Sequence, residues 1–187
     1  MTDAARVEQL RAEVLASLAA HVPLDERERL DVERTMTEMT RLDDPFSIDT
    51  GPVHVTGSGF VVGRRGTILV RHKKLGLWLQ PGGHVDAGEA PWEGARREVI
   101  EETGLPAQLL GASPELVHVS VHPLPPPIGH THLDLRYLFA AGDADPSPPP
   151  EESQEVHWFS WPDAIATAEP DLTAILEHLA ARFAPEV

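Results

Sequence analysis

The chain has 187 residues, of which 41% are hydrophobic and none is cysteine, which suits one soluble globular core with an appendage. Fifteen basic residues stand against 30 acidic ones, and the formal net charge of −15 argues against nucleic acid or an anionic membrane surface as a partner. Without cysteine, disulfides, thiol nucleophiles and cysteine zinc sites are excluded. No run approaches the about 20 apolar residues of a membrane span, and no signal-peptide pattern opens the chain, so we expect a cytoplasmic protein.

Two helices are predicted before residue 47. The first covers residues 3–20, where apolar side chains recur at helical spacing. The second begins at Asp25, which forms a capping-box pattern with Glu28, and ends before residues 43–45. We interpret the pair as a hairpin packed on the main domain, with a lid or a dimer arm as the alternative.

From Val53 the hydrophobic period changes to that of strands. Residues 54–62 and 67–71 predict a hairpin, and three later strands are expected at residues 108–110, 116–121 and 132–139. In the last of these, alternation places Leu133, Leu135, Tyr137 and Phe139 on one face and His132, Asp134, Arg136 and Leu138 on the other. A final strand is expected around Trp158, followed by a scaffold helix from Asp171.

A glycine-rich turn at Gly82 and Gly83 leads into a strongly predicted helix over residues 90–103. Pro91 suits its first turn, and Gly104 suits a left-handed cap at its end. Glu98, Glu101 and Glu102 stand at i, i+3 and i+4, so the three carboxylates share one face, repel one another and raise one another's pKa. Hard divalent cations prefer such oxygen ligands, and Mg²⁺ is commonly held by carboxylates together with substrate phosphates. A solvated acidic face is the alternative interpretation.

This stretch resembles the signature of the Nudix hydrolases at every fixed place. The matching residues are Gly83, Glu89, Arg97, Glu98, Val99, Glu101, Glu102, Gly104 and Leu105. The resemblance implies a Nudix-type α/β/α sandwich with a mixed sheet, which would occupy residues 47–187 after a helical extension at residues 1–46. The helix that carries the signature would cover one side of the sheet, and the C-terminal helix would cover the other.

The resemblance also implies a set of site residues. Glu98, Glu101, Glu102 and the carbonyl of Gly82 would bind Mg²⁺ or Mn²⁺, and Arg97 would support the catalytic site through an ion pair with Glu89. In members of the family, a glutamate shortly before the aromatic residue of the final strand joins the metal shell or takes the proton from water. Glu152 fits this place best, and Glu98 is the other candidate base. Gly83 and Gly104 would shape the turn and the helix end.

Two further groups of polar residues are candidate substrate contacts. Arg71 and Lys73 lie in the basic cluster of residues 71–74, and they would hold a substrate phosphate unless they only solvate a strand end. His132, Asp134 and Arg136 share one strand face. A polar wall of a substrate pocket is the favoured interpretation, although histidines and an acid at alternate strand positions also resemble a metal site.

The predicted function is a Mg²⁺-dependent hydrolase that cleaves the diphosphate linkage of a small, nucleotide-derived substrate. That substrate would be a nucleoside diphosphate linked to another group, or a modified nucleoside triphosphate. The alternative is a non-catalytic Nudix domain that senses a nucleotide-type ligand. Isopentenyl diphosphate isomerases share the fold but need a cysteine, which disfavours that branch. The sequence leaves open whether the chain forms a homodimer.

Overall fold

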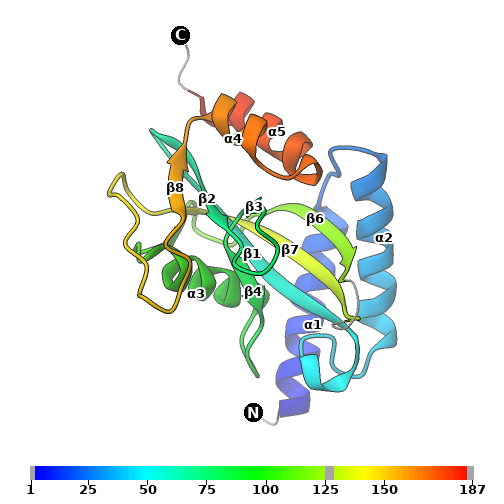
Figure 1. Ribbon diagram of the computed structural model, residues 1–187. Coiled ribbons are helices and arrows are strands. Elements are labelled where there is room, and N and C mark those ends of the chain that lie inside the picture. The colour runs from blue at the N-terminus through cyan, green and yellow to red at the C-terminus, as the bar shows by residue number, and fades with distance from the viewer. Residues whose placement is uncertain (1–2, 125–128, 185–187) are drawn as a thin grey trace.

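The structure is a computed structural model that describes residues 3–124 and 129–184. Its helices are α1 (Asp3–Ala20), α2 (Glu26–Arg41), α3 (Pro91–Thr103), α4 (Trp161–Thr167) and α5 (Thr173–Phe183), with short 3-10 turns at Ile48–Thr50 and Pro170–Leu172. Its strands are β1 (Val53–Gly63), β2 (Gly66–Arg71), β3 (Trp78–Leu79), β4 (Gly82–His84), β5 (Gln108–Leu109), β6 (Leu116–Pro123), β7 (Thr131–Ala140) and β8 (Val156–Phe159). Figure 1 shows the helices placed around a central, twisted sheet.

The eight strands form one mixed sheet. Its main path runs β3-β2-β1-β7-β5, while β4, β6 and β8 pair with β1, β7 and β2 respectively. The central strands β1 and β7 run parallel with His54 opposite His132, whereas the other described pairs are antiparallel. The long β1 strand is therefore flanked by β7 on one side and by β2 and β4 on the other.

Helices cover both faces of this sheet. Gly57 and Gly59 of β1 face α3, because a Cβ at either position would meet backbone or side-chain atoms of α3 or the neighbouring Phe139. On the opposite face, Phe60 and Val62 pack in a second apolar cluster with α4 and α5. The α/β/α sandwich that the resemblance implied is confirmed, with α3 and α5 on opposite sides.

The N-terminal hairpin packs on the same side as α3. Leu10, Val14 and Leu18 of α1 and Met39 of α2 are at most 1% exposed and join the apolar cluster that contains residues of α3, β1, β6 and β7. The hairpin is therefore part of the core, as the bracket interpretation predicted. None of the helices in the described part of the chain is long and apolar enough to cross a membrane.

The predicted elements are confirmed apart from small shifts at their ends. The face assignment of β7 is also confirmed, because Leu133, Leu135, Tyr137 and Phe139 pack in the apolar cluster that contains residues of α3, whereas Leu138 packs in the cluster with α4 and α5. The short helix α4 was not predicted; Ser160 caps it by accepting a hydrogen bond from the backbone N–H of Asp163. The C-terminal helix α5 begins two residues later than expected, because residues 170–172 form a 3-10 turn.

Candidate active site

Two features define the position of α3 on the sheet. Each end of the helix stops at a defined residue, and the helix packs directly on a glycine of β1. The backbone N–H of Ala90 donates to Glu93 Oε2 at 2.8 Å, which satisfies one donor at the helix start. Gly104 ends the helix in the left-handed conformation, with φ of 69°. At Gly57 an added Cβ would lie 2.3 Å from the carbonyl oxygen of Pro91. Only glycine therefore permits the contact that brings α3 down onto β1.

The short strand β4 lies against the acidic side of α3. The backbone N–H of Gly82 donates to Glu102 Oε2 at 3.0 Å. At Gly83 an added Cβ would lie 2.5 Å from the carboxyl carbon of Glu98. Two of the three carboxylates on α3, those of Glu102 and Glu98, therefore lie against the two glycines of the turn.

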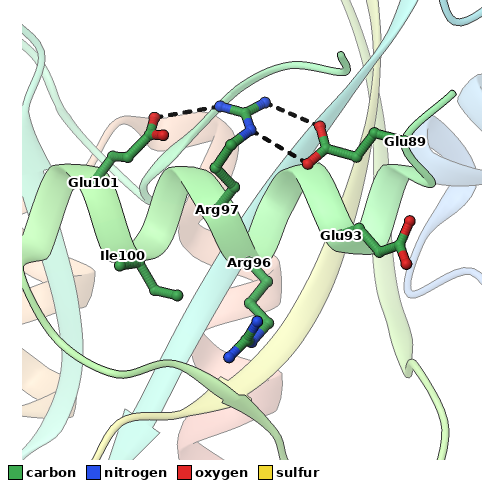
Figure 2. A pocket seen from close by; sticks show the side chains of 6 residues that line it. All are labelled: Glu89, Glu93, Arg96, Arg97, Ile100 and Glu101. Atoms are coloured by element: carbon green, nitrogen blue, oxygen red, sulfur yellow. Dashed lines mark hydrogen bonds and ion pairs between the residues drawn. The ribbon is translucent and has the colours of Figure 1, made fainter. Parts of the chain in front are cut away.

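Arg97 links two acids of α3 to Glu89, which precedes the helix. Its guanidinium contacts Glu89 Oε2 at 3.1 Å, Glu98 Oε1 at 2.7 Å and Glu101 Oε2 at 3.3 Å, and it also donates to the carbonyl of His84 at 2.8 Å. Figure 2 shows Arg97 between Glu89 and Glu101 along the helix, beside an open hollow. The predicted pair with Glu89 is present, and Arg97 additionally orients the Glu98 carboxylate.

The carboxylates crowd one another. Burial raises the pKa of Glu102 to about 7, and the negative charges of Glu98, Glu152 and Glu101 add to this rise against the opposing hydrogen bond from Gly82. Burial also raises the pKa of Glu98, although Arg97 opposes that shift. Free of other ligands, this cluster therefore holds a proton near neutral pH, which a bound cation would displace.

Glu152 lies in the loop between β7 and β8. Its negative charge helps to raise the pKa of both Glu98 and Glu102, so Glu152 lies near the cluster although it is 50 residues away in sequence from Glu102. The backbone N–H of Glu152 donates to the carbonyl of Pro149 at 3.0 Å, which helps to shape the loop. The structure thus brings Glu152 together with the signature acids.

Arg71 and Lys73 lie at the end of β2 beside the same loop. Arg71 pairs with Glu155 Oε1 at 2.8 Å, and the Lys73 ammonium donates to the backbone carbonyl of Glu151. Both cations therefore hold the segment that carries Glu152. They are exposed at its edge, where they also remain accessible to an anionic ligand.

His132, Asp134 and Arg136 lie on the face of β7 opposite α3, and they are not loose surface groups. Asp134 and Arg136 are 2% and 4% exposed, and Arg136 Nε donates to Asp134 Oδ2 at 2.8 Å. Ser58 and Thr56 on β1 donate to Asp134 Oδ1 at 2.7 and 3.0 Å. Arg136 holds the pKa of Asp134 below its usual value against the effect of burial.

Sequence reasoning missed several partners of this polar face. Ser58 and Thr56 belong to it because β1 pairs with β7 in parallel register, and Gln80 reaches Asp134 Oδ2 at 3.4 Å from the segment before β4. The alternation of polar residues at His54, Thr56 and Ser58 was the available signal. It becomes informative only when the neighbouring strand and its register are known.

The donor set of the acidic cluster fits a hard divalent cation. Glu98, Glu101, Glu102 and Glu152 offer carboxylate oxygens, and Gly82, whose N–H contacts Glu102, would add a backbone carbonyl. This is the ligand chemistry that Mg²⁺ and Mn²⁺ prefer. The raised pKa of Glu102 shows that these charges are mutually unfavourable without a cation. The residues present therefore fit the metal that the resemblance implied.

Comparison with known proteins agrees with this geometry. The NUDIX domain model matches residues 52–183. An RNA pyrophosphohydrolase of Rhodopseudomonas palustris is 39% identical over 69 residues, which are 36% of this chain and 39% of that protein. An isopentenyl-diphosphate Delta-isomerase of Streptomyces griseus is 32% identical over 113 residues, 56% of each chain. The chain thus spans about two-fifths to just over half of the length of these curated relatives.

A solved structure of a NUDIX family hydrolase from Clostridium perfringens superposes with a TM-score of 0.56 at 27% identity, covering 67% of this chain and 97% of that one. The fold, the complete signature at residues 83–105 and the family match over most of the chain define one class of protein. The chain belongs to the Nudix family.

Proposed function

We propose that this protein is a Mg²⁺-dependent Nudix pyrophosphohydrolase that cleaves the diphosphate linkage of a small nucleotide-derived substrate. The supporting observation is the crowded set of Glu98, Glu101, Glu102 and Glu152 around the Gly82 turn, which favours a cation and so favours a phosphate ligand as well. The strongly acidic chain would otherwise repel such a ligand.

In this proposal each side chain has a defined task. A bound divalent ion would neutralise charge on the diphosphate and promote attack by water. Glu98 and Glu152 are the two candidate carboxylates that would take the proton from that water, whose oxygen would bond to phosphorus as the bond to the bridging oxygen breaks. Arg97 acts as a positioning residue, because its contacts hold Glu98 and Glu101 in place.

The substrate class is a nucleoside diphosphate linked to another group or a modified nucleoside triphosphate. The exposed side chains of Arg71 and Lys73, beside the loop that carries Glu152, are proposed to bind a substrate phosphate. The buried pair of Asp134 and Arg136, together with His132, would form a polar wall on the sheet face opposite α3. Residues 47–187 would constitute the catalytic domain, and residues 1–46 its packed helical extension.

The relatives named above narrow the reaction class without fixing the substrate. Pyrophosphohydrolysis needs metal-binding carboxylates and a base, and the proposed site would supply both from its glutamates. The isomerase relative catalyses a different reaction, for which the resemblance requires a cysteine that this chain lacks. A nucleotide-sensing domain remains the rival function, and the intact signature favours the hydrolase.

A hydrolysis screen tests the proposal. The purified protein is assayed with Mg²⁺ on nucleotide sugars, ADP-ribose, dinucleoside polyphosphates and modified nucleoside triphosphates, next to Glu101→Gln and Glu102→Gln. Glu177→Gln, an exposed acid on α5, is the matched control. We expect turnover that Glu177→Gln retains and the two site variants lose by at least about 100-fold. Turnover that survives both site substitutions would refute the assigned site, and binding without turnover would establish the sensor.

A further inference from the structure

Three histidines gather on the sheet face that α3 does not cover. His54 lies on β1 directly opposite His132 on β7, and His84 on β4 pairs with Thr56, two residues farther along β1. One ring nitrogen of each of the three lies within 4.8 Å of the others. The ring centroids of His84 are 5.1 Å from His54 and 5.2 Å from His132. Three adjacent strands thus present three imidazoles to one point.

The buried ring nitrogens of this cluster lack partners. His54 is 0% exposed, and its Nε2 has no hydrogen-bond partner in the described structure; the same holds for His132 Nε2. Buried polar atoms almost always have a partner, because an unpaired one costs about 1–3 kcal/mol. Two such atoms, on rings whose centroids are 5.1 Å apart, favour a ligand that binds to both imidazoles.

The tautomer and charge of these rings suit a metal. The Nδ1 atom of His54 lies 3.4 Å from the carbonyl of Gly51, which favours the proton on Nδ1 and leaves the lone pair on Nε2. Burial lowers the pKa of His54, and it lowers the pKa of His132 to about 3, with further contributions from neighbouring histidines. Both rings are therefore neutral at physiological pH, which is the form that binds metals.

We propose that His54, His84 and His132 bind one transition-metal ion, with Zn²⁺ as the expected occupant. Imidazole nitrogens select Zn²⁺ and its neighbours in the first transition series rather than Mg²⁺, and three histidines with one open position are a common zinc arrangement. His130 lies 5.2 Å from His54 between ring centroids and is the adjacent candidate for a fourth ligand; otherwise water fills that position through the exposed His84 side.

This site is separate from the acidic cluster and does not rest on the proposed hydrolysis. Along β4, a Cβ added at Gly83 would point toward Glu98. The side chain of the next residue, His84, therefore points to the opposite face of the sheet. A metal at the histidines would tie β4 to β1 and β7. It would thereby hold the strand whose Gly82 backbone N–H donates to Glu102.

A zinc titration tests the proposal. The full-length protein, held in excess Mg²⁺ to occupy the carboxylate site, competes for Zn²⁺ with a chromophoric chelator. We expect one Zn²⁺ per chain, with affinity reduced at least about 10-fold in His84→Ala and in His132→Gln. His178→Ala, an exposed histidine on α5, is the matched control and should bind as the wild type does. Glu101→Gln should also bind Zn²⁺ normally, whatever its effect on hydrolysis.

Two further measurements distinguish the loss of a metal ligand from unfolding of the variant. Circular dichroism checks that the variants are folded; His84 is exposed, so its replacement should leave the fold intact. Co²⁺, used as a coloured substitute, should give the strong visible absorption of a four-coordinate nitrogen site in the wild type and lose it in His84→Ala. Absence of stoichiometric Zn²⁺ binding would overturn the proposal, as would binding that the histidine variants leave unchanged or that Glu101→Gln abolishes.

Discussion

The carboxylate of Glu28 on α2 accepts a 2.9 Å hydrogen bond from the backbone N–H of Val119 on β6, 91 residues later in the chain. The same carboxylate accepts from the backbone N–H of Leu24 at 2.6 Å and contacts His21 Nε2 at 2.8 Å. In the described sheet β6 pairs only with β7, so its outer edge has unpaired backbone groups. The carboxylate of Asp31 on α2 also forms a hydrogen bond with the backbone of Val121 at the same edge. The N-terminal hairpin therefore covers a strand edge that would otherwise be open to pairing with another chain.

Glu28→Ala should lower the free energy of unfolding by about 2–4 kcal/mol, because it leaves the buried N–H groups of Val119 and Leu24 without an acceptor. Urea denaturation at neutral pH measures the loss. Glu33→Ala on the same helix removes an exposed acid paired with Arg29, and its effect should stay within about 0.5 kcal/mol. Equal effects of the two substitutions would show that the Glu28 contact adds no stability.

The stability of the metal-free protein should fall as pH rises between about 4.5 and 7. The pKa of Glu102 is raised from 4.5 to about 7 on folding, so in this window the folded state binds more protons than the unfolded state. The stabilising contribution is fully present below 4.5 and is lost as pH rises through 7. Glu102→Gln should accordingly stabilise the protein in EDTA at pH 8 by up to about 3 kcal/mol, with little effect at pH 4.5.

Urea unfolding in EDTA at the two pH values measures this difference. Glu101→Gln is the control, since the Glu101 side chain is 50% exposed and its replacement should change stability little. Adding Mg²⁺ should stabilise the wild type more than Glu102→Gln at pH 8. A Glu102→Gln protein that is less stable than the wild type in EDTA at pH 8 would contradict the assigned burial and charge repulsion.

The local sequence sufficed to predict that the carboxylates of α3 lie together beside the Gly82–Gly83 turn. These residues lie within one helix and the turn before it, where the spacing of residues determines their relative position, whereas Glu152 comes from a distant loop. The alternating faces of β7 could be predicted for the same reason. The contacts of Arg71 with Glu155 and of Glu28 with Val119 could not be, because each joins segments more than 80 residues apart in sequence.

The histidine cluster also joins segments that are far apart in sequence, so the local sequence could not predict it. The alternation of residues along β7 predicts that His132 shares a polar strand face with Asp134. Its proposed partners, His54 and His84, come from two other strands and approach it only through the register of β1 with β4 and β7. Strand register depends on the whole sheet, which periodicity within one segment does not report.

Arg97→Gln should reduce hydrolysis by about 10–100-fold while the protein remains folded. The guanidinium bridges Glu89, Glu98 and Glu101, and without it the carboxylates repel one another and lose their common orientation. The Mg²⁺ concentration for half-maximal activity should rise as well. Arg96→Gln changes the adjacent residue, which donates to the carbonyl of Ala107 instead of to the acids, and should retain most activity. Equal losses in the two variants would argue against a specific positioning role for Arg97.

Gly83→Ala should impair catalysis more than it impairs folding. The new methyl group would lie 2.5 Å from the Glu98 carboxyl, so this carboxyl at the far end of a flexible side chain has to move, whereas the backbone does not. A displacement of about 1 Å at a catalytic group can cost about 100-fold in rate, and we expect kcat to fall by that order with the melting temperature nearly unchanged.

Gly82→Ala differs, because its methyl group would lie 2.7 Å from the Cα of Ser58 and should destabilise β4 itself. Gly111→Ala, which meets nothing closer than 3.9 Å, is the matched control and should behave as the wild type does. If Gly83→Ala kept full activity, Glu98 would not be fixed against this glycine in the working enzyme, and the role of the turn in placing the carboxylate would have to be abandoned.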